Sequence, residues 1–505
     1  MNWKAHINHL LFYVVVAVTS FLYWQQTKNN HIQTYTDSAI YLELADNIKN
    51  GNEYRIFLNG DLHYYSFHPP MYPALIAFLS EILNVDALTA ARILAGFFLI
   101  ITLWGFFLIF ESLKINPLLQ WIAYFLFIFS WVGELYHTVL SEQLFNIWLL
   151  FTIILSWQYI KNRSGFTVIL LGILLGLSTL TRYATLGIIP PVLGWIYFNS
   201  HKKFKRTILF IFTYLLFIFP WLIYSLIYTG TAFERKLAFH PPGFEHLKQW
   251  VITTVNWLAP GWTSFMFFPL ILLLFLVIRK TNLFGNFRVD SLKKTNDPFN
   301  LLLWIGVSYM VFILFSITFI DYDTPLDTRM LAPVYIILFI SGVYFLQKYY
   351  QKKPLLINSF IALLLISHLA DYSIKAKQRF LSVENDTGWP EKKIIQTLKS
   401  LHPEKIWSNA TDIIKANTVY DSITYEIPVK FDRTSLRINP AYDQQMQQLK
   451  KEIRNGKGIL VFFTRLNPRK FQPDEMEIRK YFKDLHMLNF PEGIIITSDK
   501  KNASQ

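Results

Sequence analysis

A short stretch near the N-terminus places an acidic side chain where an apolar helix would begin. Asp37 precedes Ile40, Leu44 and Ile48, whose four-residue spacing predicts an amphipathic helix lying at a membrane surface. Tyr41 lies one turn after the acid. A carboxylate at such a position has two ordinary roles that the sequence weighs equally: it caps the helix, or it accepts a proton as a general base.

Three further charged residues lie at the ends of apolar stretches: Glu142 opens one, Arg182 follows another and Arg329 precedes a third. Charged groups at membrane depth are usually functional. Each also has a structural alternative, because Glu142 could cap a helix and either arginine could extend to the membrane interface. A third interpretation of Arg329 is an ion pair with one of its acidic neighbours, which are Asp321, Asp323 and Asp327.

The histidines suggest two other kinds of site. His68 precedes Pro69 and Pro70, and a protonated imidazole there could meet an anion, although a neutral loop histidine without a role is an equal alternative. His240, Glu245 and His246 are weak candidates for metal ligands, with His63 as a further member. Their spacing matches no established metal motif, so solvated loop residues are the favoured interpretation.

The composition indicates which elements must position these residues. Of 505 residues, 53% are hydrophobic and only 16% are charged, and the formal net charge is +14. Soluble globular chains are about 25% charged, so this chain is typical of a membrane protein. The absence of cysteine excludes disulfides, thiolate metal sites and cysteine nucleophiles.

Hydrophobic stretches of roughly the length that crosses a bilayer recur along the first 370 residues. They predict an α-helical polytopic membrane protein with about eleven transmembrane helices. The first stretch lacks a small-residue cleavage site, so we expect an anchor and not a signal peptide. The predicted spans are 10–24, 92–110, 118–135, 142–160, 166–181, 185–199, 207–228, 262–278, 299–319, 331–347 and 354–370.

The basic residues predict the orientation of these spans. With the N-terminus in the cytoplasm, the inner loops carry 16 Lys and Arg, and the outer loops carry 8 although they are more than twice as long in total. This asymmetry follows the positive-inside rule. The loop 25–91 and everything after the last span are therefore expected outside the cytoplasm, in a multi-pass protein of the inner or plasma membrane. Membrane topology and contact with anionic lipid explain the basic residues of the inner loops. We therefore expect no nucleic-acid partner.

The composition changes after residue 370, which divides the chain into a membrane domain, 1–370, and a C-terminal extracytoplasmic α/β domain, 371–505. A helical pattern around 441–455 ends at Asn455 and Gly456. The tail has no Gly-rich phosphate loop, so nucleotide binding there has little support. The predicted strands are Lys405–Ser408, Ile427–Phe431, Ile459–Thr464 and Gly493–Thr497.

Several short motifs, taken in order along the chain, resemble those of the GT-C superfamily, the integral-membrane glycosyltransferases that use polyprenyl-phosphate-linked sugars. The similarity is greatest to the bacterial relatives of protein mannosyltransferases and of the lipid A aminoarabinose transferase. Each motif alone is loose, and their order gives the resemblance its specificity. The motifs are Asp37 with Tyr41, Pro69-Pro70-Met71-Tyr72-Pro73, Ser141-Glu142, Gly172 to Gly176 leading to Thr181-Arg182, Arg329 to Pro333, and Trp407-Ser408-Asn409.

The resemblance implies an inverting sugar transfer at the outer membrane surface, from a polyprenyl-phosphate donor to a lipid, glycan or protein acceptor. Asp37 would then be the general base, whose contribution is about 10²–10⁴-fold in rate. Many relatives have a second acid beside this position, where this chain has Ser38, so a metal-binding acidic pair is in doubt and a divalent metal ion stays an open alternative. Cations would stabilise the leaving phosphate. The candidates for donor phosphate or sugar are His68, Arg182, Arg329, Glu142 and Tyr41.

Two other classes of function are alternatives to this interpretation. A transporter or lipid flippase usually has ionisable residues at mid-membrane and related halves, whereas here the polar residues gather at span ends and no halves repeat. A non-catalytic envelope assembly protein would use the outer domain to bind a partner. A carboxylate of Asp37 that only caps a helix would favour the latter.

Overall fold

The computed structural model describes the chain except residues 1–2, 29–31, 33–35, 235–236, 238, 282–297, 322–323, 351–353, 386–391, 419, 432–436, 465–470 and 499–505. The chain forms two compact units. The first comprises Met1–Gln33, Ser66–Tyr72 and Leu88–Phe380, and the second comprises Thr34–Tyr65, Pro73–Ala87 and Leu381–Gln505. The grouping therefore differs from the predicted boundary at residue 370, because most of the loop 25–91 clusters with the C-terminal residues.

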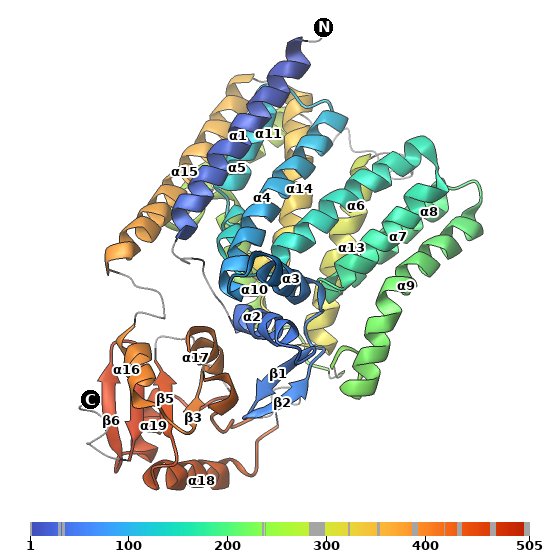
Figure 1. Cartoon of the computed structure of the whole chain (residues 1–505). Coiled ribbons are helices and arrows are strands. Elements are labelled where there is room, and N and C mark those ends of the chain that lie inside the picture. The colour runs from blue at the N-terminus through green and yellow to red at the C-terminus, as the bar shows by residue number, and fades with distance from the viewer. Residues whose placement is uncertain are drawn as a thin grey trace. The chain divides into compact units, whose positions relative to one another are not determined.

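The first unit is a bundle of helices (Figure 1). Among the described residues, seven helices are long and apolar enough to cross a membrane, or eight if the pair α10–α11, bent by 79°, is one broken span. The longer helices are α1 (Trp3–Thr27), α4 (Ala87–Ser112), α6 (Glu142–Asn162), α9 (Lys203–Tyr228), α13 (Pro298–Phe319), α14 (Thr328–Tyr350) and α15 (Pro354–Asn385). The shorter ones are α5 (Pro117–Ile128), η2 (Gly133–His137), α7 (Gly165–Thr179), η3 (Tyr183–Gly187), α8 (Ile189–Asn199), η4 (Ala232–Glu234), α10 (Phe244–Leu258), η5 (Gly261–Met266) and α11 (Phe267–Thr281).

The helices confirm the predicted class, an α-helical polytopic membrane protein. Each of the eleven predicted stretches contains a helix, but α5, α7 and α8 have only 12, 15 and 11 residues. At about 1.5 Å per residue, these are shorter than a typical hydrocarbon core. The count of eleven spans stays a prediction.

Two glycines on α7 allow it to pack closely against α9. A Cβ at Gly172 would lie 1.9 Å from Thr213 Oγ1, and one at Gly176 would lie 2.8 Å from Phe217 Cβ. Small residues four apart let membrane helices approach each other's backbone, where van der Waals contacts hold them. This spacing fixes α7, and with it the turn that follows and carries Arg182.

The second unit contains a five-stranded sheet of order β4-β3-β5-β7-β6. The strands β3 (Ile406–Ser408) and β4 (Thr424–Glu426) run parallel to β5 (Ile459–Phe463), while β7 (Gly493–Thr497) is antiparallel to β5 and to β6 (His486–Phe490). Its helices are α2 (Thr36–Lys49), α3 (Met71–Leu83), α16 (Lys393–Leu401), α17 (Thr411–Asn417), η7 (Asp421–Ile423), α18 (Tyr442–Arg454) and α19 (Glu475–Tyr481). The α/β prediction for the tail is confirmed.

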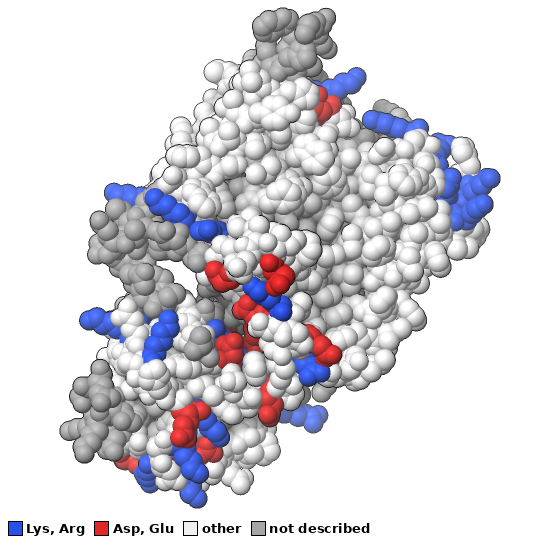
Figure 2. Space-filling view, viewed as in Figure 1, with Lys and Arg blue, Asp and Glu red and all other residues white. Residues whose placement is uncertain are grey.

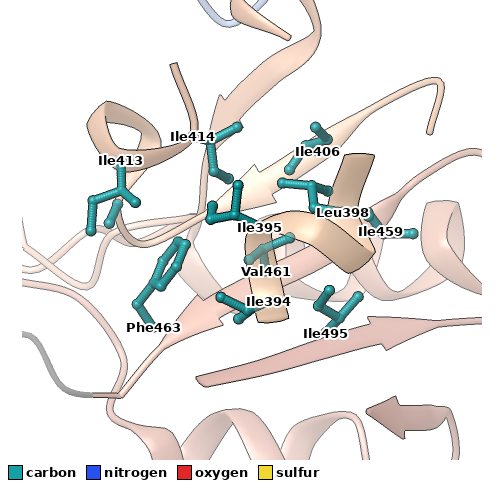
Figure 3. Close-up of a cluster of buried hydrophobic side chains, with 11 residues drawn as sticks. Ile394, Ile395, Leu398, Ile406, Ile413, Ile414, Ile459, Val461, Phe463 and Ile495 are labelled. Atoms are coloured by element: carbon teal, nitrogen blue, oxygen red, sulfur yellow. The ribbon is translucent and has the colours of Figure 1, made fainter. Parts of the chain in front are cut away.

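Both faces of this sheet are covered because both sets of alternating side chains are apolar. On one face α16 and α17 pack on Ile459, Val461 and Phe463 (Figure 3), and on the other α18 and α19 pack on Leu460 and Phe462. A strand buried on both faces reads as a continuous apolar run, which is what made β5 and β7 recognisable.

The predicted strand Ile427–Phe431 is wrong, and the strand lies just before it as β4. Pro428 has no N–H to donate to a sheet ladder, so the segment leaves the sheet. The strand β6 was not predicted. The Asn409 side chain gives the motif Trp407-Ser408-Asn409 a structural role. Its amide donates to Phe463 O at 2.9 Å and accepts from Phe463 N at 2.9 Å. This side chain continues the ladder beyond the last residue of the strand.

A two-residue hairpin joins β1 (Arg55–Leu58) to β2 (Asp61–Tyr64) in the second unit. Both turn residues have positive φ, 50° at Asn59 and 89° at Gly60. Asn-Gly is the favoured pair for such a turn because both residues tolerate the left-handed region. A Cβ at Gly60 would lie 2.4 Å from Tyr425 Oη, so the turn packs closely on the strand β4.

Candidate functional site

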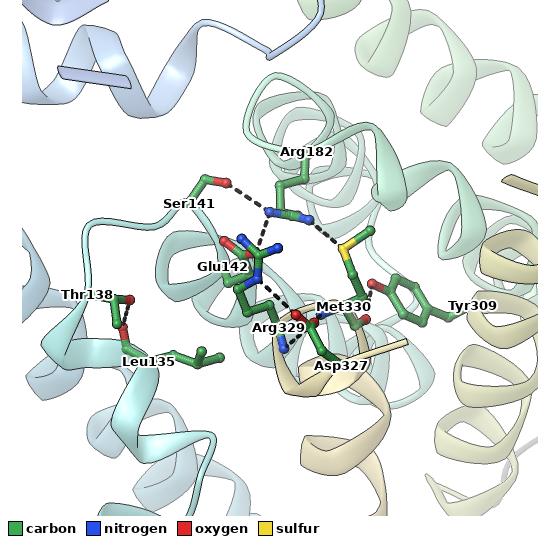
Figure 4. Close-up of polar contacts among 9 residues, drawn as sticks. All are labelled: Leu135, Thr138, Ser141, Glu142, Arg182, Tyr309, Asp327, Arg329 and Met330. Atoms are coloured by element: carbon green, nitrogen blue, oxygen red, sulfur yellow. Dashed lines mark hydrogen bonds and ion pairs between the residues drawn. The ribbon is translucent and has the colours of Figure 1, made fainter. Parts of the chain in front are cut away.

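The predicted site residues fall into both units of the chain. The first unit holds His68, Glu142, Arg182, Arg329 and the three metal candidates, while the second holds Asp37 and Tyr41. In the first unit the charged residues converge from the start of α6, the turn after α7 and the start of α14 (Figure 4).

Glu142 and Arg182 form a buried ion pair. Arg182 Nη1 lies 2.9 Å from Glu142 Oε1, and the two side chains are 14% and 2% exposed. Arg182 also donates to Ser141 Oγ at 3.1 Å and contacts Met330 Sδ at 2.9 Å. The carboxylate is at the first residue of α6, where the helix dipole favours negative charge. Arg182 therefore turns inward within the first unit and does not simply extend to an interface.

Arg329, which directly precedes Met330, forms a second ion pair, with Asp327. Its Nε donates to Asp327 Oδ2 at 3.2 Å, while Asp327 Oδ1 accepts from the backbone N–H groups of Arg329 and Met330 at 3.0 and 3.1 Å. Asp327 thus satisfies the free amides at the start of α14. Tyr309 Oη donates to Met330 O at 2.8 Å and fixes the same turn. Of the acids weighed as partners of Arg329, Asp327 is in contact, and Asp323 lies outside the described residues.

The segment that carries His68 is joined to the turn that carries Arg182. Met71 N donates to Leu180 O at 2.9 Å, and Tyr183 Oη donates to Ser66 O at 2.7 Å. His68 itself is partly buried, with its ring edge on Phe67 at a centroid distance of 5.2 Å. The proline-rich motif and the arginine motif, more than a hundred residues apart in sequence, therefore form one region of the first unit.

Gln143, next to Glu142, orders the loop before α6. Its Nε2 donates to Leu135 O at 2.7 Å and to Thr138 O at 2.6 Å, and the side chain is fully buried. Sequence reasoning missed this residue, although a glutamine beside a glutamate at the head of an apolar helix was a visible signal. Its contacts fix the backbone from which Ser141 and Glu142 project.

The three metal candidates are not brought together. His240 Nδ1 contacts Ile317 O at 2.7 Å, His246 Nδ1 accepts from Gly243 N at 3.1 Å, and Glu245 forms an exposed pair with Lys248 at 3.6 Å. Nor does the described part of the chain contain any group of three His, Asp or Glu residues that could hold a metal ion. The geometry gives the weak metal prediction no support.

In the second unit, Asp37 is the second residue of α2 and is partly buried. Tyr41, one turn later, is only 2% exposed, so it packs inward on the face that the apolar stripe predicted. An acid in the first turn is favoured by the helix dipole whether or not it has a chemical role. The position of Asp37 therefore agrees with both interpretations, a helix cap and a general base.

A buried cluster that the sequence did not reveal joins α2 to α17. Lys415 Nζ donates to Glu43 Oε1 and Oε2 at 3.3 and 3.1 Å and also to Phe57 O, and the side chains are 10% and 5% exposed. Burial raises the pKa of Glu43, and Lys415 opposes the rise. Burial, with the nearby charges of Glu43 and Asp46, raises the pKa of Asp421 to about 7. No local pattern could have paired residues 372 positions apart.

Comparison with known proteins reveals structures of the same fold. No protein-family model matches the sequence, and no curated protein matches it significantly. Among solved structures, ArnT from Cupriavidus metallidurans matches in its apo state over 99% of this chain and 100% of its own, with a TM-score of 0.58 and 11% identity. The same protein bound to undecaprenyl phosphate matches over 98% and 99%, with a TM-score of 0.54 and 11% identity.

A second similar structure is a mutant form of the arabinofuranosyltransferase AftD from Mycobacteria. It matches over 97% of this chain and 41% of its own, with a TM-score of 0.51 and 15% identity. At such identities the likeness shows the fold, and for ArnT it runs through both units from end to end. The chain therefore has the fold of the GT-C glycosyltransferases, as the order of its motifs predicted.

Proposed function

We propose that the protein is an inverting glycosyltransferase that moves a sugar from a polyprenyl-phosphate donor to a lipid, glycan or protein acceptor at the outer membrane surface. One observation carries the proposal. The fold of ArnT, which has been crystallised with undecaprenyl phosphate, is shared over nearly the whole of both chains.

Asp37 is the proposed general base. The acceptor hydroxyl must lose its proton as it attacks the anomeric carbon, while the bond from that carbon to the phosphate oxygen breaks. Asp37 would take this proton, and the leaving lipid phosphate keeps the bonding electrons. A phosphate already carries charge, so it needs cationic stabilisation and no strong general acid. Tyr41 on the same helix is proposed to bind the phosphate or the sugar of the donor.

Arg182 is the principal candidate for the donor phosphate. A guanidinium offers several N–H groups, so it can keep its bond to Glu142 while other donors meet phosphate oxygens. Glu142 is then best placed to hold the guanidinium or a sugar hydroxyl. Arg329 and His68 are secondary candidates, because Arg329 is engaged by Asp327 and the His68 segment is hydrogen-bonded beside Arg182.

The proposed location is the inner or plasma membrane, with the N-terminus in the cytoplasm and the second unit outside it. The excess of Lys and Arg in alternate loops supports this orientation. Polyprenyl-phosphate sugars that serve the outer surface would reach the protein from the same leaflet.

The test is transfer by purified full-length protein, given a panel of polyprenyl-phosphate sugars and a membrane extract as acceptor. Asp37→Asn should lower the rate by about 10²–10⁴-fold, because the amide cannot accept the proton. Expression and membrane insertion should be unchanged, since an amide also caps a helix.

Asp443→Asn is the matched control. Asp443 is likewise the second residue of its helix, α18, and is exposed. It should leave transfer unchanged, which separates loss of a base from loss of a first-turn charge. Retained transfer by Asp37→Asn would reject the assignment of Asp37. Absence of transfer from every donor of the panel by the unaltered protein would reject the proposed function.

A further inference from the structure

A groove of about 840 Å³ lies wholly within the second unit. Its volume is in the range of about 300–1,000 Å³ that ligand sites usually occupy. One wall is the outer face of α18, and another is the end of β4 with the segment that follows it. Asn59, at the turn of the β1–β2 hairpin, completes the lining. The groove has no part in the proposed proton transfer or phosphate binding.

The wall from α18 is rich in neutral amides. Gln444, Gln445, Gln447 and Gln448 all line the groove, and all four are exposed. The helix is anchored in the core of the unit by three buried residues, Met446, Leu449 and Ile453, of which Leu449 also reaches the groove lining. The core therefore holds the helix, and the amide row is presented on a rigid element.

Aromatic rings form another part of the lining. Trp407 and Tyr425 both line the groove, with ring centroids 5.9 Å apart and planes inclined by 38°. Trp407 is 8% exposed and packs in the core, so the partly exposed ring of Tyr425 is the aromatic surface open to a ligand. The hairpin turn fixes this wall, because Asn59 Oδ1 accepts from Glu426 N at 3.3 Å and Gly60 packs on the Tyr425 hydroxyl. A residue of the first loop is thereby part of the same surface as the C-terminal sheet.

The lining has three charged residues, the exposed Lys451 and the acids Glu426 and Glu452, and both acids have partners. Glu452 accepts from Gln448 Nε2 at 3.0 Å and lies 3.6 Å from Lys405 Nζ, and Glu426 accepts from Gln472 Nε2 at 3.2 Å. A phosphate or nucleic acid would call for a cluster of cations. An apolar ligand would leave the amides without partners. The lining thus favours a neutral ligand that is polar at its edges and apolar on its faces.

We propose that this groove binds a neutral saccharide chain, as the recognition site for a glycan acceptor. An amide both donates and accepts, so it matches a hydroxyl, which does the same. The C–H faces of a sugar ring pack on aromatic rings. The role as acceptor site rests on the proposed function, whereas saccharide binding itself requires no transfer. The unit that holds the groove also holds α2 and Asp37.

The test is binding of labelled neutral hexasaccharides of glucose, mannose, galactose and N-acetylglucosamine to the full-length protein in nanodiscs, without donor. An array of unrelated peptides serves as the competing ligand class. At least one saccharide should bind, and Gln444→Ala with Gln448→Ala should weaken it at least about tenfold, since two amide contacts are lost. Gln396→Ala, an exposed glutamine on α16 outside the groove, should bind as the unaltered protein does.

Three results would overturn the inference: no saccharide of the panel binds, the Gln444 and Gln448 changes leave saccharide binding intact, or the peptides bind in the saccharides' place. The substituted glutamines are exposed, so misfolding does not confound the result. Failure here is separable from failure of the proposed function. If Asp37→Asn both binds saccharide and transfers sugar as the unaltered protein does, only the assignment of the base fails. If the unaltered protein transfers sugar but binds no saccharide, only the groove assignment fails.

Discussion

The buried pair of Glu142 and Arg182 allows a structural role to be separated from phosphate binding. The Glu142 side chain is only 2% exposed and lies 2.9 Å from the guanidinium. Arg182→Met would leave this carboxylate buried and without its cation, which costs about 3–5 kcal/mol in such pairs. Glu142→Leu would leave Arg182 without its carboxylate partner, at a similar cost in unfolding free energy. Replacing both removes two charges together, and such replacements are often neutral or stabilising.

We therefore expect each single variant to lose about 3–5 kcal/mol of unfolding free energy and the double variant to return to within about 1 kcal/mol of the unaltered protein. Equilibrium unfolding in bicelles measures these values. The same three variants are then tested for binding of undecaprenyl phosphate. If Arg182 meets the donor phosphate, the double variant regains stability but not lipid-phosphate affinity, which stays at least about tenfold weaker.

A second buried pair of the first unit gives the control. Asp371 is 1% exposed and lies 2.6 Å from Lys375 Nζ. Lys375→Met with Asp371→Leu should leave undecaprenyl phosphate binding unchanged. Two results would refute the reasoning: a cost below about 1 kcal/mol for Arg182→Met, or unchanged lipid-phosphate binding by the Arg182 and Glu142 double variant.

Two predictions concern the buried cluster of the second unit. Because the folded pKa of Asp421 is raised to about 7, its destabilising effect is absent below the ordinary pKa near 3.8, grows as pH rises from there to about 7, and is constant above that. Asp421→Asn should therefore protect the amides of α2 and α17 from hydrogen exchange at pH 8 by about 1–3 kcal/mol, with little effect at pH 4; equal protection at both pH values would contradict this. Lys415→Met should lower that protection at pH 8 by about 3 kcal/mol, because Glu43 stays buried, and Glu43→Gln on top of it should restore part of the loss.

Features set by local pattern were recoverable from the sequence. Apolar stretches gave the helices of the first unit, and continuous apolar runs gave β5 and β7, because burial on all sides leaves a direct compositional trace. The ends of elements and the short strands were predicted less accurately. β4 begins three residues before the predicted strand, and β6, which has no fully buried residue, was missed. The predicted strand was misplaced because Pro428 has no N–H to donate to the sheet ladder.

The sequence by itself determined the membrane character of this protein, its α/β tail and the order of motifs that places it with the GT-C fold, since these depend on periodicity and neighbouring residues. It also singled out Glu142, Arg182 and Arg329 as charges at span ends. Only the tertiary structure decided that Arg182 pairs with Glu142 and Arg329 with Asp327, that Lys415 reaches Glu43, and that the metal candidates stay apart. The pairs of Arg182 with Glu142 and of Lys415 with Glu43 join residues distant in the chain, and packing, which no local pattern encodes, brings them within hydrogen-bonding distance. Asp327 was already one of three neighbouring acids weighed for Arg329, and the structure decided among them.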